Sequence, residues 1–260
     1  MNNTLFFVGT GRCGTHFTAE LFSHEKEVTS HHERYPIPET FERYCQWYDL
    51  PVDHAGFIDI MRQGINQDLE KKKFSFESSA YLSFSIKELY DQFSSKIVLL
   101  TRHPKKMIES YINKGWYDKL FIQGNSELAL GLQHGKLAHH TFSRFAPKGA
   151  YFDTWNNASR IVKLAWYWKV LNEKTITLGK QIGTENFKVI HIEDFDFNCY
   201  LEIAEWIKLK PTLTEKKFLK VRNKKPGKVK YDPITWLDSD LSSYKEICAE
   251  LGSELGYEIN

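Results

Sequence analysis

A glycine-rich segment near the N-terminus is the first place where residue types and spacing suggest chemistry. Residues 9–16 read GTGRCGTH and follow the short apolar run at residues 5–8. Glycines let a backbone approach an anion closely, and the N–H groups that open a following helix attract negative charge. The segment therefore predicts a loop that binds a phosphate group.

The same glycines also fit a dinucleotide-binding fingerprint. They have GxGxxG spacing, and Glu33 lies 19 residues after the last of them, near the usual place of a ribose-binding acid. This leaves open a Rossmann-type, NAD(P)-dependent oxidoreductase. Arg12 counts against it, because a dinucleotide site relies on backbone N–H groups and has little room for a guanidinium. A Walker A loop is excluded, since it requires Lys where this chain has Thr15.

Strands separated by helices are expected to position this loop. Apolar runs typical of buried strands occur at residues 5–8, 96–101 and 188–192. Helical patterns occur at residues 158–181, 198–209 and about 239–255, and Pro104 fits the first position of another helix. The alternation predicts an α/β fold in three layers, with a central parallel sheet flanked by helices.

Residues 30–76 look less regular. Pro36, Pro38 and Pro51 are expected to interrupt any long helix there. Such regions often supply acceptor sites. Trp47 and Tyr48 stand near Asp49, a combination that suits a polar or cationic acceptor such as an alkaloid, although core packing explains aromatic clusters more often.

Composition narrows the class of protein. The chain has 260 residues, of which 42% are hydrophobic and 26% charged, so we expect a single domain over residues 1–260. The net charge of +2 predicts neither a nucleic-acid nor a membrane partner, and no apolar run is long enough to span a bilayer. Four widely spaced cysteines predict no zinc site and no disulfide scaffold, which fits a cytoplasmic location.

The N-terminal segment resembles that of the sulfotransferases that use 3′-phosphoadenosine-5′-phosphosulfate (PAPS), in particular stand-alone soluble bacterial members. Their opening strand and loop include the form GxGRSGT, which FFVGTGRCGTHF matches with Cys13 in the serine place. The resemblance implies a P-loop-type fold and contact of Arg12 with the 5′-phosphate and the transferring sulfuryl group. The other loop residues that it implies for PAPS binding are Gly11, Cys13, Gly14, Thr15, His16 and, near the adenine, Phe17.

Two further motifs support the resemblance. In the family, an Arg that ends a strand and a Ser eight residues later bind the 3′-phosphate, and Arg102 and Ser110 have this spacing in RHPKKMIES. A guanidinium and a hydroxyl can satisfy phosphate oxygens from two directions. The basic segment RNKKPGKVK resembles the loop that closes over the same phosphate, which implies roles for Lys224, Lys225 and Gly227, with Arg222 as a replacement for any of them.

The sequence departs from the family at the general base. Where many members carry a Lys or His, this chain has Ser78 and Ser79. Some bacterial members use a carboxylate in a His-Glu-Pro-like segment, and SHHERYPIPETFERY resembles it. Glu33 is therefore the expected base. His32, Glu39 and Glu42 remain alternatives.

The resemblance implies in-line transfer of the sulfuryl group from PAPS to a hydroxyl or nitrogen of a small acceptor, and a polar natural product is one candidate for it. The co-product would be 3′-phosphoadenosine-5′-phosphate (PAP). No metal is expected. Besides the oxidoreductase, an inactive nucleotide-binding module that kept the loop and lost the base remains an alternative.

Overall fold

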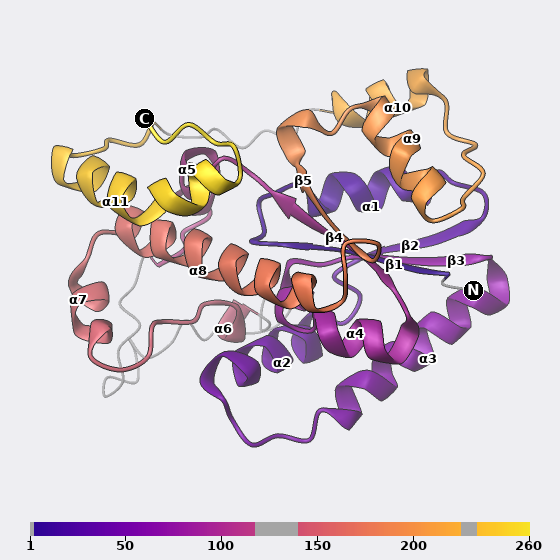
Figure 1. Cartoon of the computed structure of the whole chain (residues 1–260), viewed down its shortest axis with the longest axis horizontal. Helices are drawn as coiled ribbons and strands as arrows, with labels where there is room; N and C mark the ends of the chain where they lie inside the picture. The colour runs from indigo at the N-terminus through magenta and orange to yellow at the C-terminus, as the bar shows by residue number, and fades with distance from the viewer. Residues whose placement is uncertain (1–2, 118–139, 225–232) are drawn as a thin grey trace.

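Five parallel strands form the centre of the molecule (Figure 1). The computed structural model describes residues 3–117, 140–224 and 233–260. The strands are β1 (Thr4–Gly9), β2 (Val28–His32), β3 (Phe74–Ser78), β4 (Lys96–Thr101) and β5 (Phe187–His191), and their order in the sheet is β2-β3-β1-β4-β5. Every residue of β1 is buried, as expected for a central strand covered on both faces.

Helices cover both faces of this sheet. Among the described residues they are α1 (Thr15–Ser23), α2 (Pro36–Tyr48), α3 (Ala55–Lys71), α4 (Ile86–Phe93), α5 (Pro104–Ile112), α6 (His140–Ser143), α7 (Tyr151–Asn157), α8 (Arg160–Gln181), α9 (Phe197–Trp206), α10 (Glu215–Arg222) and α11 (Asp238–Glu254), with 3-10 helices η1 (Ala80–Phe84) and η3 (Ile192–Asp194). Helices α1, α9 and α10 pack on one face, and α3, α4 and α8 on the other (Figure 1). The predicted three-layer α/β fold is confirmed.

The expected elements agree closely with the observed ones. Strand β4 has the predicted bounds, and β5 begins and ends one residue earlier than predicted. Helix α8 begins at Arg160, two residues after the expected start, because the Ser159 hydroxyl caps it by accepting a hydrogen bond from the N–H of Val162.

The expectation of no long helix between residues 30 and 76 was wrong. Helix α3 there has 17 residues and α2 has 13. Pro36 and Pro38 lie in the first turn of α2, where the missing N–H has no intrahelical partner to lose, and Pro51 lies between the two helices. The prolines therefore open and separate these helices.

The strand order bears on the oxidoreductase alternative. In the classic dinucleotide-binding order, the second strand lies next to the first. Here β3 separates β2 from β1, so Glu33, which directly follows β2, stands two strands away from β1. Because β2 and β3 lie on one side of β1 and β4 on the other, the direction of winding changes at β1. Open parallel sheets bind ligands at the carboxyl ends of strands at this point.

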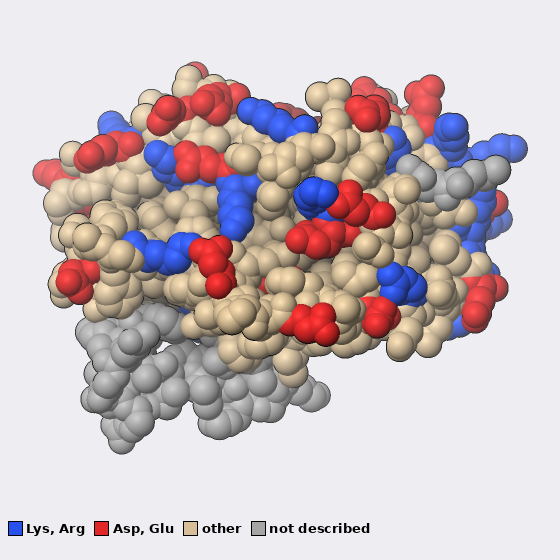
Figure 2. Space-filling view, turned by 60° about the horizontal axis from the view of Figure 1, so that its bottom comes forward, with Lys and Arg blue, Asp and Glu red and all other residues tan. Residues whose placement is uncertain are grey.

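The surface carries charges of both signs. Lys and Arg side chains alternate with Asp and Glu on the face shown in Figure 2. Within the ranges given above, no helix is long and apolar enough to cross a membrane.

Candidate active site

The loop between β1 and α1 has an unusual backbone. Gly11, Arg12 and Gly14 have φ angles of 80°, 55° and 103°, in the left-handed region. A Cβ at Gly11 would collide with the hydroxyl of Tyr111, so only glycine fits there. Arg12 has a Cβ and pays a conformational cost in this region, and such strained residues cluster at binding and catalytic sites. The loop is therefore shaped for close approach of a ligand to its backbone.

The two motifs that were predicted to bind phosphate groups meet at this loop. Arg12 Nε donates a hydrogen bond to Ser110 Oγ at 2.9 Å. Arg102 Nη1 donates to the carbonyl oxygen of Arg12 at 2.8 Å. The contacts join residues 98 and 90 positions apart in the sequence, so the fold brings together the three side chains that the sequence selected separately.

A small open pocket of about 250 Å³ adjoins these residues. It is lined by Arg12, Cys13, Gly14, Arg102, Lys106, Ile192 and Glu193. Three of these side chains are basic and one is acidic. The excess of positive charge suits an anionic group.

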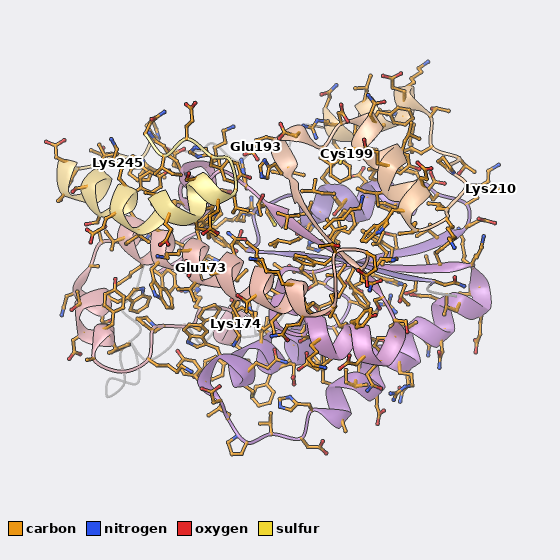
Figure 3. The ribbon with its side chains drawn as sticks, viewed as in Figure 1. Glu173, Lys174, Glu193, Cys199, Lys210 and Lys245 are labelled. Atoms are coloured by element: carbon orange, nitrogen blue, oxygen red, sulfur yellow. The ribbon has the colours of Figure 1, made fainter. Side chains whose placement is uncertain are left out.

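Sequence reasoning missed Lys106 and Glu193 as residues of this pocket. Glu193 lies at the carboxyl end of β5 (Figure 3), where Oε1 accepts a hydrogen bond from the N–H of His103 at 3.2 Å. Lys106 Nζ is 3.9 Å from the same oxygen, and the Tyr257 hydroxyl is 3.5 Å from Oε2. Glu193 and Tyr257 lie in the segments VIHIEDF and LGSELGY, in which no residue was expected to bind a ligand.

Glu33 directly follows β2 and has a half-buried carboxyl group whose pKa is perturbed. Its N–H donates to the carbonyl oxygen of Ser78 at 3.3 Å, and its φ of 50° is again left-handed. Burial and the neighbouring Glu39 raise the pKa of Glu33 to about 7, against the opposing effects of Arg43 and Arg12. A carboxyl with a pKa near neutrality can accept a proton and release it again.

His32 lies beside Glu33, with Nε2 3.9 Å from Oε1 of the carboxyl group. Its ring stacks on His16 with centroids 3.6 Å apart, and Nε2 forms a 3.1 Å hydrogen bond with the Thr15 hydroxyl. Burial and then His16 lower the pKa of His32 to about 3, so its imidazole is neutral near pH 7 and a weak base. These contacts connect the end of β2 to the beginning of α1, directly after the glycine-rich loop.

Glu39 and Glu42 lie on α2, and their carboxyl groups are engaged by residues outside this helix. Glu39 is fully buried and accepts hydrogen bonds from Ser79 Oγ at 2.5 Å and from the N–H of Tyr35 at 2.9 Å. Glu42 pairs with His54 Nδ1 at 2.5 Å. Burial is the main cause that raises the pKa of each carboxyl. Of the acids in this segment, Glu33 is the one with a partly exposed carboxyl beside the loop.

No family model matches the chain, and no curated protein matches it in sequence. Sulfotransferase STF9 from Mycobacterium avium is similar in structure, with a TM-score of 0.60 and 12% identity over 99% of this chain and 78% of that one. The sulfotransferase domain of the Synechococcus PCC 7002 olefin synthase has a TM-score of 0.52 and 12% identity over 98% and 95%.

A third solved structure, a sulfotransferase from Alicyclobacillus acidocaldarius, has a TM-score of 0.51 and 12% identity, over 99% of this chain and 97% of that one. The chain has the sulfotransferase fold. The fold that the sequence resemblance implies, a P-loop-type arrangement of parallel sheet and helices, is therefore confirmed.

The remaining residues that were predicted to bind PAPS include Phe17 and residues of the basic segment RNKKPGKVK. Phe17 packs edge-on against Phe195 and Phe218, with Arg222 Cζ 5.8 Å from its ring centre. Lys224 Nζ pairs with Glu20 at 2.9 Å. Lys225 and Gly227 lie outside the described residues.

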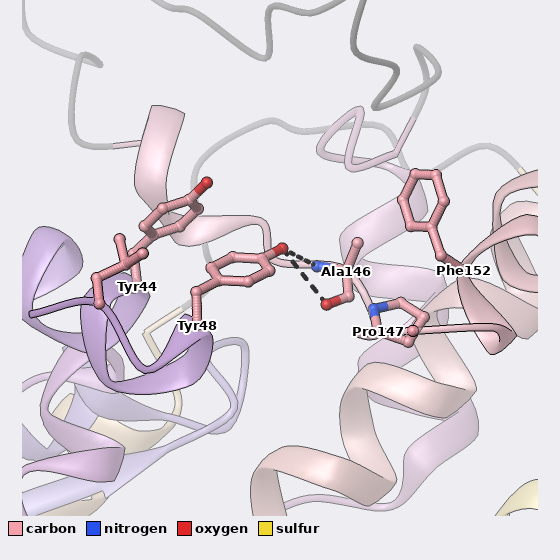
Figure 4. A pocket seen from close by; sticks show the side chains of 7 residues that line it. Tyr44, Tyr48, Ala146, Pro147 and Phe152 are labelled. Atoms are coloured by element: carbon pink, nitrogen blue, oxygen red, sulfur yellow. Dashed lines mark hydrogen bonds between the residues drawn. The ribbon is translucent and has the colours of Figure 1, made fainter.

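The aromatic cluster expected to favour a cationic acceptor is partly occupied by the chain itself. Lys148 and Lys174 place ammonium groups 5.5 and 5.7 Å from the ring centre of Trp47, and Lys148 also pairs with Asp49. Tyr48 contributes to a second pocket of about 420 Å³ (Figure 4), where its hydroxyl accepts a 2.9 Å hydrogen bond from the N–H of Ala146. Two lysine side chains of the chain itself therefore already supply cations beside the Trp47 ring.

Proposed function

We propose that this chain is a PAPS-dependent sulfotransferase. It moves the sulfuryl group of PAPS to a hydroxyl or nitrogen of a small-molecule acceptor and releases PAP. The observation that carries the proposal is the meeting of Arg12, Arg102 and Ser110 at a strained glycine loop, within a sulfotransferase fold.

The donor nucleotide would bind along the carboxyl ends of β1 and β4. The backbone N–H groups of residues 13–16 would hold the 5′-phosphate at the beginning of α1, where the helix dipole favours negative charge. Arg102 and Ser110 would bind the 3′-phosphate, with Lys106 as an additional cation at the pocket. An anion of this charge fits a pocket whose lining is mainly basic.

The transfer step would be an in-line displacement at sulfur. The acceptor oxygen or nitrogen attacks the sulfur atom, the bond from sulfur to the 5′-phosphate oxygen breaks, and PAP leaves with that electron pair. Glu33 takes the proton of the acceptor. Arg12 and the loop N–H groups stabilise the charge that grows on the departing phosphate, which is the main task in group transfers of this type.

Nucleotide titration tests the proposal against its alternatives. A thermal shift assay with PAP, NAD and ATP should give a clear rise in melting temperature for PAP. Stabilisation by NAD without stabilisation by PAP would favour the oxidoreductase. Binding of PAP without sulfation of any acceptor in a screen with labelled PAPS would favour the inactive module.

Arg102→Ala should weaken PAP binding while the protein still folds. The variant removes a charge-assisted hydrogen bond to phosphate, and each such bond contributes about 1.5 to 3 kcal/mol. Isothermal calorimetry measures the affinity. Arg62→Ala, which removes an exposed guanidinium that pairs with Asp59, is the matched control and should bind PAP normally. Unchanged PAP affinity in folded Arg102→Ala would contradict the assignment.

We propose further that the chain acts as a single domain on a polar small molecule in the cytoplasm. Its one sheet contributes residues to core clusters on both faces, which supports a single folding unit. All four cysteines are free thiols, as is usual for proteins of a reducing compartment.

A further inference from the structure

Arg43 carries a buried charge that the proposed mechanism does not use. The residue lies on α2 and is 0% exposed. Its guanidinium donates to the carbonyl oxygens of Ala80 and Ser143, each at 3.0 Å, and to the hydroxyl of Tyr167 at 3.3 Å. Nε has no hydrogen-bond partner in the described part of the chain. A guanidinium buried among neutral acceptors is costly unless negative charge lies nearby.

The negative charge near Arg43 belongs to Glu33 and Glu39. Consecutive residues from the end of β3 to the beginning of η1 form hydrogen bonds with Glu33, Glu39 and Arg43. The carbonyl of Ser78 accepts from the N–H of Glu33, and Ser79 Oγ donates to Glu39. The next carbonyl, that of Ala80, accepts from Arg43.

This segment is where the sequence lacks the Lys or His that related sulfotransferases carry. Instead of supplying a base, it binds the backbone N–H of Glu33, the carboxyl group of Glu39 and the guanidinium of Arg43. Glu39 and Arg43 are four residues apart on α2 and therefore lie on the same side of the helix. The segment thus organises the base that comes from the end of β2.

Arg43 also packs against two aromatic rings, of which one, Tyr81, interacts with Glu33. Its Cζ is 5.0 Å from the ring centre of Tyr81 and 5.5 Å from that of Phe145. The Tyr81 phenol is close enough to Glu33 that the carboxylate helps to raise the pKa of Tyr81, after the larger effect of burial. Tyr167 connects Arg43 to the loop between β1 and α1, since its hydroxyl donates to the Thr10 carbonyl at 3.2 Å.

We propose that Arg43 is a positioning residue for sulfuryl transfer, which keeps the Glu33 carboxylate ionised beside the repelling charge of Glu39 and holds Tyr81 next to it. The inference rests on the proposed function, with Glu33 as the base. Glu33 is faced by Glu39 and Arg43 from α2, by Arg12 from the loop, by His32 from β2 and by Tyr81 from η1. The positive charges of Arg43 and Arg12 both oppose the rise in the pKa of Glu33.

The test is the pH dependence of kcat with saturating PAPS and a working acceptor. In the wild-type protein the acidic limb should have its midpoint at about pH 7, where Glu33 titrates. Arg43→Met removes the favourable charge and should move this midpoint upward by about 1 pH unit or more. Arg43→Lys, which keeps the charge, should leave the midpoint nearer to the wild-type value.

Glu39→Gln should shift the midpoint of the acidic limb in the opposite direction, because it removes the charge that repels the Glu33 carboxylate. Its acidic limb should move to lower pH. Arg160→Met is the matched control, since Arg160 also donates to two backbone carbonyls, those of Ile112 and Trp116. A purely structural loss should lower the stability of Arg160→Met without moving the midpoint.

An unmoved acidic limb in folded Arg43→Met would overturn the inference. If that variant does not fold, an unmoved or upward limb in Glu39→Gln would overturn it instead. Different results would contradict the proposed function itself: PAP would not bind, or Glu33→Gln would keep full activity. A loss of activity in Glu33→Gln with no movement of the limb in Arg43→Met would refute the role of Arg43 alone.

Discussion

Arg12→Ala should lower single-turnover sulfation by about 100-fold or more. In the transfer step, negative charge moves onto the phosphate oxygen that leaves the sulfur, and a fixed guanidinium stabilises this charge more in the transition state than in the bound donor. Arg12 is fixed by its own contacts, since Nε is bonded to Ser110 and the Arg12 carbonyl is bonded to Arg102. The measurement is the rate with PAPS and an acceptor in rapid mixing.

Two variants control this prediction. Arg12→Lys keeps a positive charge and loses the planar fork, so its rate should lie between those of the wild type and Arg12→Ala. Ser110→Ala removes the hydrogen-bond partner of Nε and should weaken PAP binding more than it slows transfer. A wild-type transfer rate in folded Arg12→Ala would contradict a role for Arg12 at the departing phosphate.

Local patterns in the sequence predicted the parts of the fold that depend on local chemistry. The apolar run at residues 96–101 became β4 because a strand buried on both faces needs an uninterrupted apolar run. The glycines of the loop predicted a backbone that a ligand can approach closely, and Gly11 and Gly14 have left-handed φ angles. Pro36 was misinterpreted because proline has opposite effects at the first turn and in the interior of a helix, and the start of α2 was not recognised.

The site residues that the sequence missed depend on contacts between distant segments. Glu193 reaches the pocket because β5 is the neighbour of β4, and no spacing in the sequence contains that information. Arg43 looks like a surface charge of an amphipathic helix until α2 is packed against η1 and the end of α6. Buried charges of this type follow no local periodicity.

The environment of Glu33 also needed the structure. The sequence suggested the residue through its place after a strand and its resemblance to carboxylate-using sulfotransferases. In the structure, burial and Glu39 raise the pKa of Glu33 to about 7. The proximity of Glu39, which adds to this shift, results from the way α2 turns back after β2. The same geometry gives His32 a pKa of about 3, which makes Glu33 the better candidate for the base.

Glu33→Gln should lower turnover by about 10² to 10⁴ and leave PAP affinity nearly unchanged. The amide keeps the size of the side chain and cannot accept the acceptor's proton. Only the ionised carboxyl works as a base, and its pKa of about 7 means that wild-type turnover should fall as the pH drops below 7 and level off above it. Glu33→Gln should lose this dependence together with the activity.

Single-turnover assays of His32→Ala and Glu39→Gln separate Glu33 from its neighbours. His32 is already neutral near pH 7, so His32→Ala should act mainly through its lost contacts with His16 and Thr15 and should keep the pH profile. Glu39→Gln keeps the base and should remain active with an acidic limb at lower pH. Full activity in Glu33→Gln together with a collapse in His32→Ala would transfer the role of base to the imidazole, because a proton acceptor that can be deleted without loss is not the one the reaction uses.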